Sequence, residues 1–278
     1  MIRRSACLLF AASLLLLPRT AAAQPTCLFL HGSGVAGDNT FSSVSPVRLD
    51  AMGNSIAYWG DTAAHVSDLC TPMFANFDTV HASLSDPSLM QAFYSKSLEV
   101  TLAGGVVFAH GSANDVLARS CNLFGLCSVR WYGLGAMLRG SGVAALAAVR
   151  DVGFAESVPS ELVPQSWTLG PLAATVRTRN LLRGLACGTN SQGSGGRDAG
   201  ALIVNTNLAY GPSADQLAAP LTGSCRSWRS CQSDGLVHVD ECGSDVVNGV
   251  DGPQLVEFGA FQTSTASPFF LYPGNHWD

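Results

Sequence analysis

Three side chains that could together carry out nucleophilic catalysis occur in the chain order Ser112, Asp234 and His276. Ser112 follows a Val-Val-Phe run, Asp234 opens an Asp-Gly turn, and His276 lies in a Gly-Asn-His loop. In such a set the serine attacks an acyl carbonyl, the imidazole takes its proton, and the carboxylate orients the imidazole. Each residue alone is also an ordinary turn or loop residue, so the prediction of acyl transfer depends on their joint occurrence in this order.

The turn that holds Ser112 is unusual because a glycine precedes the serine. Val106–Ala109 predicts a buried strand and Ala113–Ser120 a helix, so a sharp strand-to-helix turn lies between them. In one register Ser112 is the nucleophile. In the other, Gly111 occupies the nucleophile position and Ser112 contributes only a backbone N–H. Crowding by the histidine and asparagine two positions either side of Ser112 favours the second register, whereas the tolerance of glycine for positive φ keeps the first register open.

A Gly-rich loop after the first expected strand could supply hydrogen-bond donors to an oxyanion. Thr26–Leu30 predicts a buried strand, and the loop His-Gly-Ser-Gly follows it. The backbone N–H groups of Gly32 and Ser33, together with that of Ala113 after the elbow, are the candidate oxyanion hole. We expect His31 to shape this loop by hydrogen bonding rather than to transfer protons.

Strand-like runs alternate with helical patterns, which predicts an α/β fold with a mainly parallel sheet and helices on both faces. The polar stretch 35–50 is expected to be turn-rich, and 188–233, rich in Gly, Ser, Asn and Pro, to be an excursion that could cover the site. The remaining expected strands are Ser55–Asp61 and Val129–Tyr132, and the remaining expected helices are Pro87–Leu98, Gly142–Arg150 and Leu172–Leu185.

The first 23 residues predict a signal peptide, which leaves a single domain at 24–278. Arg3 and Arg4 precede the apolar core Ala6–Leu17, and Ala21–Ala23 is a small-residue cleavage pattern. The apolar core is shorter than the roughly 20 residues that span a bilayer. We therefore expect a protein that is secreted or held in the secretory-pathway lumen, without a stable membrane span; an uncleaved signal anchor is the alternative.

Charge and residue spacing exclude several kinds of partner. Of the 15 basic and 20 acidic residues, the signal segment carries three arginines and no acidic residue, so the remaining chain has a net charge of −8. This charge argues against nucleic acid and anionic membrane surfaces as partners, because both need clustered Lys and Arg. The sequence has no Cys-x-x-Cys and its histidines are scattered, so no metal site is predicted, and the acyl-transfer chemistry needs no cofactor. The sequence makes no prediction of the oligomeric state.

The cysteine count predicts disulfides. Loss of the signal segment removes one of nine cysteines, and an even number in a secreted chain favours pairing. Eight cysteines allow 105 pairings, so no complete pattern is predicted. Cys27, inside an expected buried strand, could instead be a free thiol. The pairs close enough to clip local loops are Cys121/Cys127 and Cys225/Cys231, and the cysteines available for longer bridges are Cys70, Cys187 and Cys242.

Together these motifs resemble the α/β-hydrolase superfamily. More narrowly, they are similar to secreted α/β-hydrolase-like proteins of eukaryotic microbes, which carry a His-Ser-x-Gly-Asn elbow, a Trp-Gly-Asp segment, an Asp-Gly acid turn and an Asn-His-x-Asp ending. The corresponding segments here are His110–Asn114, Trp59–Asp61, Asp234–Gly235 and Asn275–Asp278, and Leu138–Ser141 and Cys187–Thr189 also fit this group.

The resemblance implies a single-domain α/β-hydrolase-like fold and an esterase or lipase activity on a small acyl or lipid ester, with Ser112, Asp234 and His276 as the triad. The elbow is atypical in having glycine before the serine. If Gly111 stands at the nucleophile position, the chain is instead a catalytically inactive hydrolase fold that acts as a secreted binding or surface protein. The sequence leaves both possibilities open.

Overall fold

The structure is a computed structural model of the 278-residue chain. It describes residues 24–32, 34–49, 55–79, 83, 85–124, 127–138, 181–188, 242, 254–255 and 269–272. Ser33, Asp234, His276, the expected signal segment and the expected helix at 142–150 lie outside these residues, as does the expected excursion after Gly188.

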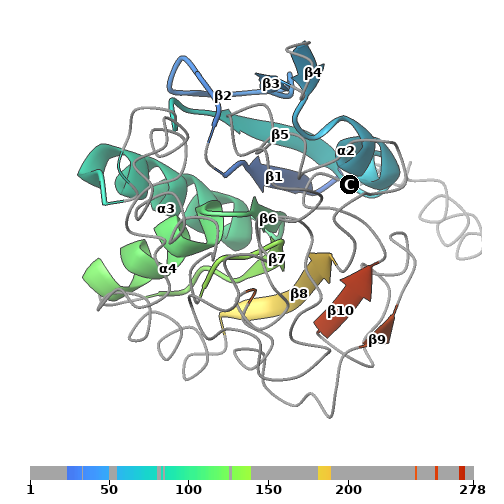
Figure 1. The fold of residues 1–278 in the computed structure, drawn as a ribbon. Helices are drawn as coiled ribbons and strands as arrows, with labels where there is room; N and C mark the ends of the chain where they lie inside the picture. The colour runs from blue at the N-terminus through green and yellow to red at the C-terminus, as the bar shows by residue number, and fades with distance from the viewer. Residues whose placement is uncertain are drawn as a thin grey trace, which may run out of the picture.

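Most described strands form one eight-stranded sheet in the order β2-β5-β1-β6-β7-β8-β10-β9 (Figure 1). Neighbouring strands are parallel, except that β2 at one edge is antiparallel to β5. A separate antiparallel pair consists of β3 (Val47–Leu49) and β4 (Ser55–Ala57). The sheet strands are β1 (Thr26–Leu30), β2 (Thr40–Ser42), β5 (Thr71–Asn76), β6 (Val106–His110), β7 (Trp131–Leu134), β8 (Leu182–Gly188), β9 (Gln254–Leu255) and β10 (Phe269–Tyr272).

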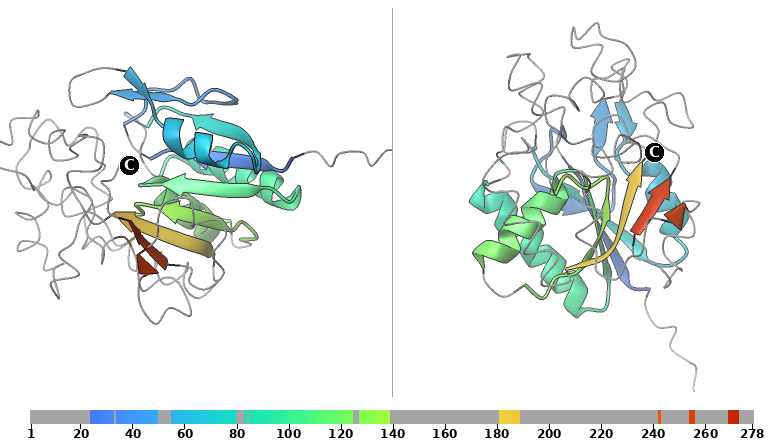
Figure 2. Two further views of the ribbon diagram at one scale, coloured as in Figure 1. Left: turned by 90° about the vertical axis from the view of Figure 1, so that its right-hand side faces the viewer. Right: turned by 60° about the horizontal axis from the view of Figure 1, so that its bottom comes forward.

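Helices cover both faces of the sheet. Helices α3 (Pro87–Leu102) and α4 (Ala113–Leu123) pack on one face, and α2 (Gly60–Val66) lies on the other, in front of the strands in the left view of Figure 2. The alternation of side chains along β1 explains this layering. Leu28 and Leu30 belong to the core with α3 and α4, whereas Phe29 belongs to the core with α2. The predicted α/β class, with a mainly parallel sheet and helices on both faces, is confirmed.

Helix α3 begins where its sequence predicts. Pro87 occupies the first turn, where a missing N–H costs nothing, and the Asp86 side chain accepts hydrogen bonds from the N–H groups of Ser88 and Leu89. Its apolar positions bury Leu89 and Phe93 against the sheet. Val100, beyond the expected end at Leu98, is also buried, and the helix continues to Leu102.

Several expected elements differ in type. Leu182 and Leu185, assigned to a helix by their spacing, lie in strand β8. This strand is buried between β7 and β10, so its run of apolar residues lacks the alternation that marks a half-exposed strand. The expected strand at Ser55–Asp61 ends at Ala57 and is followed by α2, the strand at Val129–Tyr132 is shifted to β7, and the polar stretch 35–50 contains β2 and β3.

The described disulfides join Cys27 to Cys70, Cys121 to Cys127, and Cys187 to Cys242. The local Cys121–Cys127 loop is confirmed, and Cys225 and Cys231 lie outside the described residues. The suggestion that Cys27 is a free thiol is wrong. Cys27 pairs in register with Pro72 of β5, so Cys70, just before that strand, comes within reach of it.

No helix in the described part of the chain is long and apolar enough to cross a bilayer.

Candidate functional site

The strand order places the candidate site at the carboxyl ends of β1 and β6. From β1 the chain goes to β5 on one side and then returns through α3 to β6 on the other side. In open α/β sheets such a reversal leaves a crevice between the two strands, in which ligands bind. The loop after β1 (His31 and Gly32) and the turn after β6 with the start of α4 (Gly111–Asp115) meet at this reversal. We refer to them as the β1 wall and the α4 wall of the candidate site.

The turn after β6 is made by Gly111. Its φ is +53°, in the left-handed region that glycine adopts without a steric penalty. Its N–H still donates to the carbonyl of Leu134 in β7 at 2.9 Å. The next residue, Ser112, has ordinary helical angles (φ −66°, ψ −14°) and caps α4 without a side-chain capping hydrogen bond. The reversal of direction thus falls on the glycine, and Ser112, 2% exposed, is the N-cap of α4 with helical backbone angles.

Asn114 holds this turn in place. Its side-chain Nδ2 donates to the carbonyls of Ala109 at 3.0 Å and Gly111 at 2.9 Å, and its Oδ1 accepts from Trp131 Nε1 at 2.9 Å. One buried amide therefore joins the end of β6, the turn and strand β7. In the sequence Asn114 stood out only as a bulky neighbour of Ser112, and its positioning role follows from these contacts.

His31 stabilises the opposite wall. Its Nε2 accepts from the N–H of Phe77 at 3.1 Å, so the ring hydrogen resides on Nδ1, which donates to the Gly32 carbonyl at 2.8 Å. Burial lowers the pKa of His31 to about 4, partly offset by the hydrogen bond to Gly32. The imidazole is thus neutral and structural, as expected from the sequence.

Gly32 brings the two walls into contact. A Cβ atom built on it would lie 3.0 Å from the His110 carbonyl oxygen and 3.2 Å from the Ser112 amide nitrogen, so only glycine fits without displacing the elbow. Its own N–H, a candidate oxyanion donor, donates to the hydroxyl of Tyr58 at 2.9 Å. In this structure the Gly32 amide therefore has an internal acceptor.

Tyr58 is a site residue that sequence reasoning missed. Its hydroxyl is hydrogen-bonded to His110 Nδ1 at 2.6 Å as well as to Gly32. Burial raises the pKa of the Tyr58 phenol, so the hydroxyl keeps its proton. The sequence offered no signal for this role, because Tyr58 lay within an expected strand and its partners are 26 and 52 residues away.

Asp115, in the first turn of α4, is a second residue that sequence reasoning missed. Its side chain is 0% exposed, and neither carboxyl oxygen has a hydrogen-bond partner among the described residues. Burial raises the pKa of Asp115 well above its usual value, and the positive charge of Arg119 offsets this only in part. Burial therefore favours the protonated form of this carboxyl group.

Of the sequence-predicted site residues, the structure brings together Ser112, Ala113 and Gly32. Ser33, Asp234 and His276 lie outside the described residues. In chain order His276 follows β10 by four residues, and β10 is parallel to β6, so the two strands end at the same edge of the sheet.

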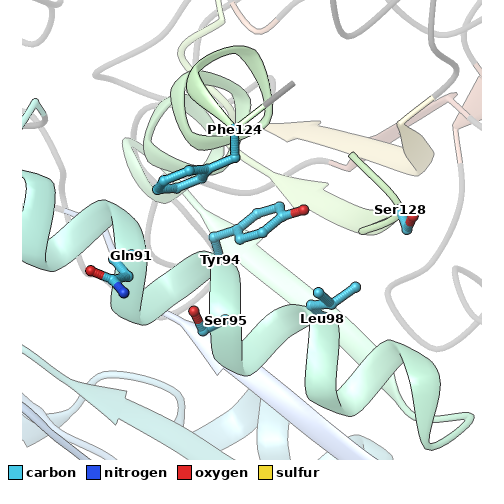
Figure 3. A pocket seen from close by; sticks show the side chains of 6 residues that line it. All are labelled: Gln91, Tyr94, Ser95, Leu98, Phe124 and Ser128. Atoms are coloured by element: carbon cyan, nitrogen blue, oxygen red, sulfur yellow. The ribbon is translucent and has the colours of Figure 1, made fainter. Parts of the chain in front are cut away.

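A separate hollow of about 480 Å³ lies on the outer side of α3 (Figure 3). The rings of Tyr94 and Phe124 form one wall with centroids 5.2 Å apart, and the Tyr94 hydroxyl points toward Ser128. Phe124 follows the last turn of α4, about 16 Å along the helix from its first residue. The hollow is thus distinct from the crevice. Its lining residues are Gln91, Tyr94, Ser95, Leu98, Phe124 and Ser128.

Among the described residues, no group of three or more His, Cys, Asp or Glu side chains is placed to hold a metal ion.

No protein-family model matches the chain, and no curated protein matches its sequence. Solved structures with a similar fold include the mature lipase BlEst2 from Bacillus licheniformis, with a TM-score of 0.49 and 14% identity over 92% of this chain and 86% of that chain. The phospholipase PlaB from Legionella pneumophila has a TM-score of 0.44 and 14% identity, over 80% of this chain and 46% of that chain. Likenesses this distant carry no inference about the site.

Proposed function

We propose that this chain is a hydrolase-like protein without the nucleophile, and that it binds an oxygen-bearing ligand at the elbow without hydrolysing it through Ser112. The observation that carries the proposal is the positive φ of Gly111 directly after β6, with Ser112 already helical. In an α/β-hydrolase elbow the nucleophile sits on the sharp, strained turn between strand and helix. Here that position is Gly111, which has no side chain to attack with.

The remaining parts of the elbow favour binding of an oxygen atom. The N–H group of Ala113 lies in the first turn of α4, where amides have no carbonyl partner within the helix. The helix dipole adds partial positive charge at the same end, equivalent to roughly half a unit charge. Gly32 approaches the Ser112 amide closely enough to bound the site from the β1 side. A carboxylate or carbonyl oxygen fits a helix start of this kind.

The alternative is a secreted serine hydrolase in which Ser112 attacks, His276 takes its proton, Asp234 orients the imidazole, and Gly32, Ser33 and Ala113 stabilise the oxyanion. The burial and helical conformation of Ser112 disfavour this reading. For either reading we propose secretion, supported by the three disulfides, which form and persist in oxidising compartments.

Fluorophosphonate labelling of the oxidised, purified protein tests the proposal, because the probe reacts only with an activated serine. We expect no labelling of the folded wild type, and no change in Ser112→Ala. Ser128→Ala, beyond the far end of α4, is the matched control. Labelling of the wild type and of Ser128→Ala that disappears in Ser112→Ala would establish the serine hydrolase instead.

A further inference from the structure

The hollow on the outer side of α3 has the size of a site for a small organic ligand (Figure 3). Its volume of about 480 Å³ lies within the roughly 300–1,000 Å³ that ligand pockets occupy. It lies at the opposite end of α4 from the elbow, because Phe124, one of its lining residues, follows the last turn of that helix. An occupant of the hollow therefore does not depend on the elbow.

One side of α3 forms the floor of the hollow. Gln91, Tyr94, Ser95 and Leu98 are spaced three and four residues apart, so they are neighbours on one face of the helix. Phe93, which lies between them in the sequence, belongs to the buried core instead. The floor is thus the solvent side of α3, and Gln91 and Ser95 are exposed there.

The wall opposite α3 is held by a disulfide bond. The bond between Cys121 and Cys127 closes a loop that contains Phe124, and Ser128 directly follows this loop. Cys121 is part of the buried core, so the bond ties the loop to the core. The Phe124 ring lies against the Tyr94 ring of α3 with centroids 5.2 Å apart. The two sides of the hollow are therefore held in place by the protein alone, which lowers the ordering cost of binding a ligand.

The described lining is uncharged and contains several hydrogen-bonding groups. Gln91 supplies an amide, and Ser95 and Ser128 supply hydroxyls. Among the described residues, no side chain is hydrogen-bonded to these three groups. The two charged residues of α3, Lys96 and Glu99, do not line the hollow and pair with each other at 2.8 Å. The described lining thus offers donors and acceptors but no charge that would select an ion.

The apolar part of the lining comes from Tyr94, Leu98 and Phe124. Aromatic rings present broad, flat apolar surfaces. The C–H face of a sugar ring packs on such a surface, while the hydroxyl groups at the edge of the sugar reach polar side chains. A purely apolar ligand would cover the amide and the two serine hydroxyls without replacing their hydrogen bonds to water, which is unfavourable. The combination favours a neutral ligand with both an apolar face and many hydroxyl groups.

We propose that the hollow is a binding site for a neutral saccharide of one or two sugar rings. The sugar packs on the exposed surface of the Tyr94 and Phe124 rings, and its hydroxyl groups pair with Gln91, Ser95 and Ser128. The proposal concerns binding alone, and no bond is made or broken. It goes beyond the function proposed for the elbow and does not rest on it.

The test is saturation-transfer NMR of the oxidised full chain with four neutral disaccharides: cellobiose, maltose, lactose and N,N′-diacetylchitobiose. We expect transfer to the ring protons of at least one of them. Hexanol, which is apolar, and glucuronate, which is anionic, are the comparison ligands and should bind more weakly than that disaccharide. No transfer to any of the four disaccharides, or tighter binding of hexanol or glucuronate, would overturn the proposal.

Substitutions place the sugar in the hollow. Ser95→Arg fills the hollow from an exposed position, so we expect it to abolish disaccharide binding without lowering Tm. Its matched control is Ser67→Arg, at the exposed end of α2 on the other face of the sheet. Gln91→Ala removes one hydrogen-bonding group and should weaken binding by about fivefold, whereas Gln24→Ala, which removes an exposed amide outside the hollow, should leave it unchanged. Equal affinities of the wild type and Ser95→Arg would contradict the proposed site.

Discussion

The two walls of the crevice differ in how they satisfy their buried polar groups. In the β1 wall, both ring nitrogens of His31 are hydrogen-bonded, and the Gly32 carbonyl accepts from His31 and from the Thr79 hydroxyl at 2.9 Å. In the α4 wall, Asn114 is fully paired while Asp115 beside it has no partner among the described residues. The β1 wall thus satisfies the buried polar groups named here, whereas the α4 wall contains a buried carboxyl group without a partner among the described residues.

The same difference gives the walls opposite responses to pH. His31 favours its neutral form in the folded state, so its contribution to stability is present above its unfolded pKa of about 6.5 and is lost as the pH falls toward 4. Asp115 favours its protonated form. Stability therefore falls as the pH rises above about 4, the unfolded value, until the raised folded pKa is reached. In the wild type these two dependences of stability on pH have opposite sign. Variants of His31 alone or of Asp115 alone separate them.

The largest effect is expected from Asn114→Ala, which breaks the paired half of the α4 wall. The change leaves the buried Trp131 N–H and the Ala109 carbonyl without their amide partner. We expect a loss of about 4 kcal/mol in the free energy of unfolding, from unsatisfied groups and the cavity together. Urea denaturation measures it, with the exposed Asn122→Ala on the same helix as control. Equal stabilities of the two variants would contradict the positioning role of Asn114.

His31→Gln tests the pH response of the β1 wall. The pKa of about 4 predicts that His31 accounts for a loss of about 3 kcal/mol between pH 6.5 and 4, because the unfolded chain takes up a proton that the folded chain refuses. Stability of the variant and the wild type is measured by urea unfolding across this range. The difference between them should shrink as the pH falls, and a constant difference would show that His31 does not titrate as described.

Tyr58→Phe tests the link between the walls. Removal of the hydroxyl takes the acceptor from the Gly32 amide and one partner from His110, so we expect a loss of about 2 kcal/mol. The freed Gly32 N–H should also exchange faster with solvent, which amide hydrogen exchange resolves. Unchanged exchange at Gly32 would mean that Tyr58 does not protect that amide.

Asp115→Asn is expected to have the opposite sign. It removes the cost of keeping a buried acid protonated, so the variant should gain stability relative to the wild type as the pH rises from 3 to 7. Thermal unfolding at the two pH values measures this. A variant less stable at pH 7 would show that the carboxylate is stabilised in the fold.

Local signals sufficed to predict β1, β6, α3 and α4 from the sequence, because each has a clear apolar pattern and α3 also has its Asp-Pro start. Part of strand β8 was predicted as a helix, because a strand buried on both faces lacks the alternation of apolar and polar residues that marks a half-exposed strand. The Cys27–Cys70 bridge depends on β5, which has no strong pattern and was not predicted.

The candidate site also has parts that the sequence predicts and parts that it does not. The elbow and the His-Gly loop follow from local motifs, and their meeting follows from strand order. The roles of Tyr58 and Asp115 come from tertiary contacts and burial. Neither could be predicted from neighbouring residues, because an isolated tyrosine or a first-turn aspartate is usually an ordinary core or helix-terminal residue.

The most direct test of the central claim, that Gly111 stands at the nucleophile position, is fluorophosphonate labelling of Gly111→Ser beside the wild type, with the adduct mapped by mass spectrometry. A side chain at this position follows β6 on the turn with positive φ. The account predicts an adduct at position 111 in the variant and none on the wild type. An adduct on Ser112 in the wild type would contradict it.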